Sequence, residues 1–100
     1  MNNERIDREL WTSFASLIRS YGAAHGLNSR YQAVVEVGSN LILLRAGTRW
    51  LRFTPGEMTE DNNRTVPFHL NHDGTATIDG VTEEMDLAAE RLAREMMQSE

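Results

Sequence analysis

The stretch Leu41-Ile-Leu-Leu-Arg-Ala-Gly-Thr-Arg-Trp-Leu-Arg-Phe53 decides the fold, because two apolar segments flank the dipeptide Gly47-Thr48 in it. Glycine at the first central position of a two-residue loop predicts a type II′ β-hairpin. Side chains alternate across a strand, so this register fixes which residues share a face of the sheet. Four apolar side chains then point to one side: Ile42, Leu44, Leu51 and Phe53.

The same register defines the opposite face of the hairpin, where Leu43 lies across from Arg52 and Arg45 across from Trp50. A solvated sheet face is normally polar, and an apolar patch on it often marks a binding surface. Trp and Arg are also enriched among the residues that dominate binding energy at interfaces. The predicted partner-binding residues are therefore Leu41, Leu43, Arg45, Trp50 and Arg52.

Three interpretations of this second face remain open. The face could be ordinary, either because a helix of the same chain covers it or because single exposed apolar residues are normal, and Arg45 over Trp50 is then only a cross-strand cation–π pair. A second copy of the chain could bury it, since two-fold homodimers are the commonest assemblies. A foreign protein, a small molecule or an anion could bind there, because arginine side chains suit carboxylate and phosphate groups.

Apolar residues at three- and four-residue steps predict a helix from about residue 4 to residue 26, ended by Gly26. Its predicted stripe comprises Ile6, Leu10, Phe14, Leu17, Tyr21 and Ala24, widened by Trp11 and Ile18. Residues 31–37 alternate as a strand. A turn at residues 38–40 then keeps Val35 and Val37 on the inner side of the hairpin.

The polar composition of residues 54–63, with one proline and one glycine, predicts a loop that is the most mobile segment of the chain. Residues 64–70 predict a strand that lies at an edge or has a bulge, because Pro67 lacks an N–H group. The His72-Asp73-Gly74 segment predicts a three-residue hairpin loop that pairs Leu70 with Ala76 and Phe68 with Ile78.

Asp79-Gly80 is predicted to end the sheet, and Thr82 to cap a second helix. The apolar stripe predicted for that helix is Val81, Met85, Ala88, Ala89, Leu92 and Met96. The sequence therefore predicts a single α+β domain over residues 1–100. It is a two-layer sandwich of an N-terminal helix, an antiparallel meander of about five strands and a C-terminal helix.

Composition excludes several classes of function. The 100 residues contain no cysteine, which rules out disulfides, thiolate nucleophiles and cysteine-bound metals. The net charge of −5 argues against non-specific nucleic-acid binding. No apolar run approaches the roughly 18 residues of a membrane span, and the charged N-terminus predicts no secretory signal. We therefore expect a soluble, cytoplasmic protein without membrane or nucleic-acid partners.

Candidate chemistry is sparse. His69, His72, Asp73 and Asp79 are close in sequence, as in a His/carboxylate metal site, but a strand residue and a turn residue need not direct their rings to one point. The sequence has no nucleophile elbow and no glycine-rich phosphate loop. We therefore predict no metal, no cofactor and no catalytic residue.

These observations predict a small non-enzymatic interaction protein, acting as an adaptor, a regulator or a chaperone, and homodimeric through the second face of the hairpin. The alternative is a small-molecule or anion-binding domain that uses the Arg and Trp side chains of that face, and an enzyme ranks third. In size, acidic charge and helix–sheet–helix order the chain is similar to small acidic secretion chaperones. It shares no motif with them and lacks the helix that they insert between sheet strands.

Overall fold

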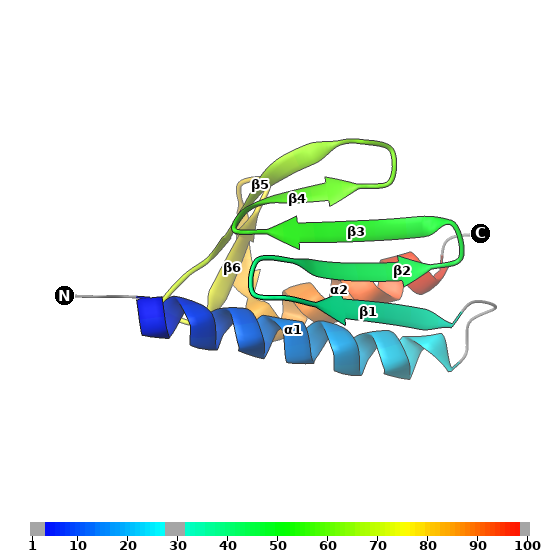
Figure 1. Ribbon diagram of the computed structural model, residues 1–100, viewed down its shortest axis with the longest axis horizontal. Coiled ribbons are helices and arrows are strands. Elements are labelled where there is room, and N and C mark those ends of the chain that lie inside the picture. Colours follow the sequence, from blue (N-terminus) through cyan, green and yellow to red (C-terminus); the bar gives the residue numbers. More distant parts are fainter. Residues whose placement is uncertain (1–3, 28–31, 99–100) are drawn as a thin grey trace.

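The structure is a computed structural model that describes residues 4–27 and 32–98. Within these residues, two helices flank a seven-stranded antiparallel sheet whose strands are neighbours in space in their order along the chain (Figure 1). The elements are α1 (Glu4–Gly26), β1 (Ala33–Val37), β2 (Ile42–Ala46), β3 (Arg49–Thr54), β4 (Gly56–Glu60), β5 (Thr65–Leu70), β6 (Thr75–Ile78), β7 (Val81–Glu84) and α2 (Met85–Gln98).

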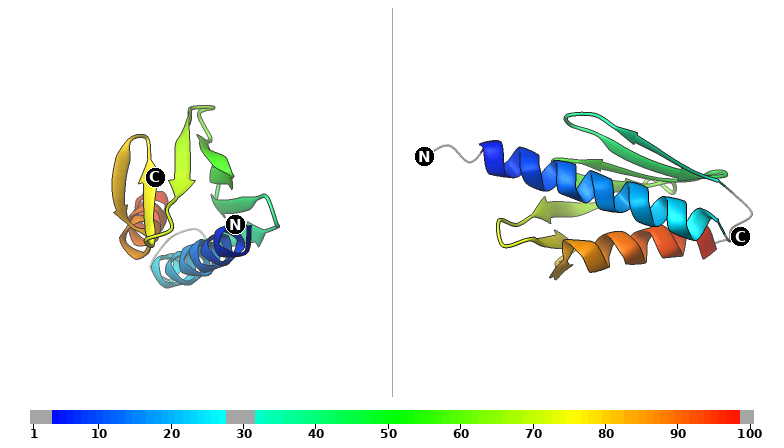
Figure 2. Two further views of the ribbon diagram at one scale, coloured as in Figure 1. Left: turned by 90° about the vertical axis from the view of Figure 1, so that its left-hand side faces the viewer. Right: turned by 90° about the horizontal axis from the view of Figure 1, so that it is seen from below.

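Both helices pack on the same face of the sheet, which we call the inner face. They lie side by side, and the views from the end and from below show both of them on one side of the strands (Figure 2). The predicted α+β sandwich of two layers is therefore confirmed, with seven strands in place of about five. The other face of the sheet, the outer face, carries no helix within residues 4–27 and 32–98.

Three phenylalanines hold the two layers together. Phe14 of α1 packs against Phe53 of β3 and Phe68 of β5, and the ring centroids lie 5.2–5.3 Å apart in all three pairs. Tilted and edge-on rings at this spacing attract each other beyond their burial alone. The cluster joins the first and second halves of the meander to the same helix.

The predicted hairpin registers are confirmed. Leu44 pairs with Leu51 and Ile42 with Phe53, and Gly47 has a φ of 63°, as the first central residue of a type II′ turn requires. The registers predicted for the other two hairpins are also confirmed by three pairs: Val35 with Leu44, Phe68 with Ile78, and Leu70 with Ala76. Tyr31, where the first strand was predicted to begin, lies outside the described residues.

The buried face of α1 is rotated from the predicted stripe. Phe14 and Ile18 are fully buried, whereas Ile6 and Ala24 at the ends of the predicted stripe are exposed. Gly22 is buried against the sheet, where a Cβ atom would lie 3.5 Å from the side chains of Ala33 and Leu44. The missing side chain lets the last turns of α1 approach β1 and β2 closely.

The prediction of a mobile loop over residues 54–63 is wrong, because these residues contain β4. This strand is paired on both sides, with β3 and with β5, and Met58 is buried at its centre. It is entered through Pro55-Gly56, where Gly56 has a φ of 98°. Pro followed by Gly with positive φ is typical of a type II turn, which here closes a hairpin.

Two further predictions are wrong at the end of the sheet. Asp79 and Gly80 both have positive φ, at 54° and 83°, so they form a two-residue hairpin turn into β7 and do not end the sheet. Thr82 therefore lies in a strand and caps no helix, and Val81 faces Ile78 across the hairpin and has no place in a helix stripe.

Pro67 lies in an interior strand, since β5 pairs with both β4 and β6. Its carbonyl oxygen accepts a hydrogen bond from the N–H group of Asp79, at 2.9 Å, just beyond the end of β6. In an antiparallel strand the N and O atoms of one residue point to the same neighbour. The missing N–H group therefore falls where the β5–β6 ladder stops, which is how an interior strand tolerates this proline.

Candidate interaction surface

All five predicted partner-binding residues lie on or beside the outer face of the first three strands. Two more outer-face residues of β1 adjoin them, since Val34 pairs with Arg45 and Glu36 with Leu43. We call this surface the β1–β3 patch. It comprises Val34, Glu36, Leu41, Leu43, Arg45, Trp50 and Arg52.

The β1–β3 patch combines four apolar with three charged residues, and no helix of the described chain covers it. Val34 is 43% exposed, and the side chains of Leu43 and Trp50 are half-buried by their neighbours on the sheet alone. Their inner-face neighbours Leu44 and Phe53 are 0% exposed under the helices. Of the three interpretations of this face, burial under a helix of the same described chain is therefore wrong.

The charged residues of the patch pair differently from the prediction. The Arg52 guanidinium lies over the Trp50 ring, 5.7 Å from its centroid, in the position that one of the three interpretations gave to Arg45. Arg45 instead approaches Glu36 of β1 at 3.6 Å. Both partners of that pair are about half exposed, and an exposed ion pair contributes little to stability.

The outer face of the last four strands differs from the patch. Its centre is a set of threonines, which we call the threonine face: Thr59, Thr65, Thr77 and Thr82. The hydroxyl oxygens of Thr59 and Thr65 lie 3.1 Å apart, and those of Thr77 and Thr82 lie 2.7 Å apart. These side chains therefore hydrogen-bond to each other across neighbouring strands, as an ordinary solvated face does.

On the helix side, two polar contacts join α1 to α2. The Tyr21 hydroxyl donates to the Asp86 carboxylate at 2.6 Å, and His25 Nε2 lies 2.9 Å from the Glu90 carboxylate. The hydrogen bond to Asp86, followed by burial and by the charges of Asp86 and Glu90, raises the pKa of Tyr21 above its ordinary value of 10.0. These contacts secure the helix layer and lie away from the β1–β3 patch.

The structure does not bring the suspected metal ligands together. His72 Nε2 lies 2.8 Å from the Asp7 carboxylate of α1, while His69 is exposed on β5. Asp73 accepts hydrogen bonds from the hydroxyl and the N–H group of Thr75, which lower the pKa of its carboxyl group. Among residues 4–27 and 32–98 there is no group of three or more His, Asp or Glu side chains placed to hold a metal ion.

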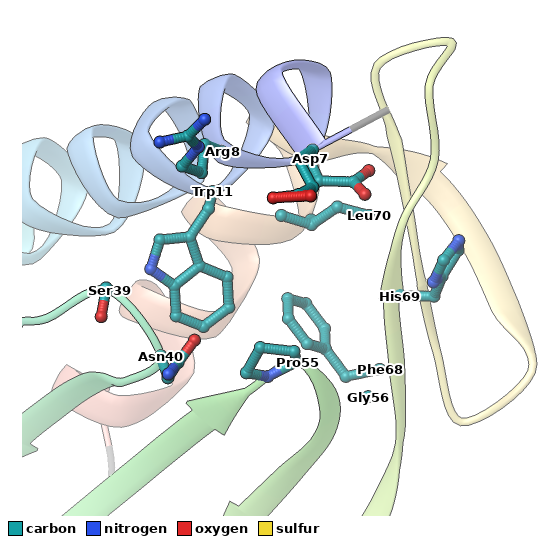
Figure 3. Close-up of a pocket in the computed structure, with 11 residues that line it drawn as sticks. Asp7, Arg8, Trp11, Ser39, Asn40, Pro55, Gly56, Phe68, His69 and Leu70 are labelled. Carbon is teal, nitrogen blue, oxygen red and sulfur yellow. The ribbon is translucent and has the colours of Figure 1, made fainter. Parts of the chain in front are cut away.

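Sequence reasoning missed a cavity of about 320 Å³ beside the N-terminal half of α1 (Figure 3). Its walls come from α1, from the turns at residues 39–40 and 55–56, and from β5. No local pattern in the sequence signals such a cavity, because its residues come from four separate segments.

The fold and the patch define a helix–meander–helix α+β protein with an open apolar sheet face. Comparison of the chain with protein-family models, with curated proteins and with solved structures finds no match. In the part of the chain that the structure describes, neither helix has the length and apolar character needed to cross a membrane.

Proposed function

We propose that the protein is a small non-enzymatic interaction protein that forms a homodimer through the β1–β3 patch, and that it acts as an adaptor, a regulator or a chaperone. The observation that carries this proposal is the position of the two helices. Both cover the inner face, so Leu43 and Trp50 on the outer face have no cover from the described chain.

Burial of the patch would be favourable. Fully burying one large apolar side chain contributes roughly 1.5–3 kcal/mol, and the patch offers four such side chains that are only partly buried. Association must first offset the loss of translational and rotational freedom, estimated at about 4–15 kcal/mol. The patch therefore supports a dimer only if several of these side chains are buried together, which their position on one face of neighbouring strands allows.

The charges of the patch favour a second copy as the occupant. A two-fold interface brings the same surface together with itself, so it must carry complementary groups. Glu36 and Arg52 lie at opposite sides of Leu43 in one transverse row of the sheet. Arg52 makes no ion pair with any residue that the structure describes, so it is available to the Glu36 carboxylate of a second copy.

Light scattering after gel filtration tests the proposal. The wild-type protein is expected at twice the 11.4 kDa mass of one chain. Leu43→Arg, which places a charge at the centre of the patch, is expected to give a folded monomer, and Trp50→Ala is expected to weaken the dimer.

Thr65→Arg is the matched control, because Thr65 lies in the same transverse row as Leu43 but on the threonine face. It is expected to remain a dimer. A wild-type monomer at all concentrations would exclude self-association and favour a foreign ligand for the patch, such as an anion held by Arg52. Loss of the dimer in Thr65→Arg and Leu43→Arg alike would place the interface elsewhere.

A further inference from the structure

The cavity beside α1 has the size and lining of a small-molecule site. Its volume of about 320 Å³ lies at the lower end of the roughly 300–1,000 Å³ that is typical of ligand pockets. A second cavity of about 350 Å³ lies beneath α2, but its arginines, Arg49, Arg64 and Arg91, are all held in ion pairs with acidic neighbours. The cavity beside α1 is therefore the better candidate for a ligand.

Flat apolar groups form the walls of this cavity. The Trp11 ring faces a hollow that is bounded by Pro55, Phe68 and Leu70 (Figure 3). The indole N–H group of Trp11 donates to the Gly38 carbonyl oxygen at 2.9 Å. That hydrogen bond fixes the ring and uses its only donor, so the indole offers a ligand its π face.

The charge that faces the hollow is negative. Asp7 borders it, and its side chain is 62% exposed with His72 on one oxygen atom. A carboxylate accepts more than one hydrogen bond, so Asp7 retains capacity for a ligand. Glu4 also borders the cavity. The two basic side chains of the lining, Arg8 and His69, are turned elsewhere. The Arg8 guanidinium points away from Pro55 and Phe68, and the His69 ring lies on the far side of β5 (Figure 3).

We propose that this cavity binds a small organic cation that has a flat apolar body. The body packs between the Trp11 face and the walls formed by Pro55 and Phe68, and the protonated amine reaches the Asp7 carboxylate. A flat aromatic body that stacks on the indole face gains attraction beyond its burial alone. The hydrogen bond of an ammonium group to a carboxylate is stronger than one between neutral groups. This site is separate from the β1–β3 patch, so it stands or falls independently of the dimer.

Nuclear magnetic resonance titration of the wild-type protein tests the proposal with two probes that share one ring, benzylamine and benzoate. Benzylamine is expected to give saturable shifts of the Trp11 indole N–H signal and of the Ser39 and Asn40 amides. The Trp50 indole signal, on the outer face, is the internal control and is expected to stay in place. Benzoate is expected to bind at least about tenfold more weakly, which corresponds to about 1.4 kcal/mol.

Asp7→Asn is expected to weaken benzylamine binding about tenfold, the loss expected when one charged hydrogen-bond partner becomes neutral. Glu84→Gln removes the same charge from an exposed position on β7 and is expected to leave binding unchanged. The proposal is overturned if benzylamine causes no saturable shift, if benzoate binds as tightly, or if the shifts centre on Trp50. The comparison of benzylamine with benzoate uses the wild-type protein alone. It therefore tests the proposal even if Asp7→Asn fails to fold.

Discussion

The outer face of this sheet has two halves that differ in chemistry although they share one fold. The threonine face has hydroxyl groups that bond to each other across neighbouring strands. The β1–β3 patch has Leu43 and Trp50 at outward positions, and Leu43 lies in the same row as Thr59 and Thr65. Neither half lies under a helix of the part of the chain that the structure describes (Figures 1 and 2). The threonine face shows that this sheet needs no apolar residues at its outward positions.

The two halves of the outer face meet in one transverse row of the sheet. This row crosses the strands through Glu36, Leu43, Arg52, Thr59 and Thr65. Threonine is β-branched and favours strands as the large apolar residues do. Strand propensity therefore does not explain Leu43 and Trp50, and their presence is consistent with the proposed burial of this surface in a dimer.

The largest effect is expected from a residue that both halves share. Phe68 is fully packed against Phe14 and Phe53, so Phe68→Ala is expected to reduce the free energy of unfolding by about 3–5 kcal/mol. Urea denaturation measures this loss. A loss below about 1 kcal/mol would show that the two halves do not depend on a common core.

A smaller effect is expected from making the threonine face more apolar. Thr77→Val keeps the shape of the side chain but removes the hydroxyl group that contacts Thr82 and Asn71. Because this site is partly open to water, the loss is expected to stay below about 1 kcal/mol in urea denaturation. Light scattering is expected to give the same mass as wild type. If this one substitution raises the mass, apolar character alone drives association, and the β1–β3 patch has no special role.

The smallest effect concerns pH and the helix layer. The hydrogen bond to Asp86 raises the pKa of Tyr21 in the folded protein above its ordinary value of 10.0. At a pH below 10.0 the neutral phenol therefore contributes fully to the stability of the fold. This contribution is lost as the pH rises above that value, because the phenolate then faces Asp86 and Glu90. Stability measured across this range is expected to fall more steeply for wild type than for Tyr21→Phe. Equal slopes for the two proteins would show that the Asp86 contact does not bias the titration.

The sequence predicts those parts of the sheet in which apolar and polar residues alternate clearly along the strand. The register around Gly47 follows from apolar residues that match on one side and from a glycine in the place that the turn requires. The strand β4 was missed because Met58 is its only large apolar residue and acids surround it. The strand β7 was missed because Thr82 followed by acids is also typical of a helix start, although Asp79-Gly80 is a strong hairpin signal.

The candidate sites were predictable to different degrees for the same reason. The β1–β3 patch follows from the alternation of side chains along two neighbouring strands. Four of the five predicted residues, Leu43, Arg45, Trp50 and Arg52, therefore lie together on the outer face, and Leu41 directly precedes β2. The contacts within it were less predictable. Arg45 has two possible partners on adjoining strands, and Glu36 approaches it in place of Trp50. The cavity beside α1 depends on how a helix sits against three other segments, which no local pattern encodes.

The most direct test of the central claim compares the two tryptophans of the chain by hydroxyl-radical footprinting over a dilution series. Trp50 and Trp11 are both half-buried in the single chain, but only Trp50 lies in the β1–β3 patch. If a second copy covers the patch, Trp50 is protected at high protein concentration and becomes reactive on dilution, while Trp11 reacts equally throughout. If both tryptophans react alike at every concentration, the β1–β3 patch is not an interface between copies of this chain.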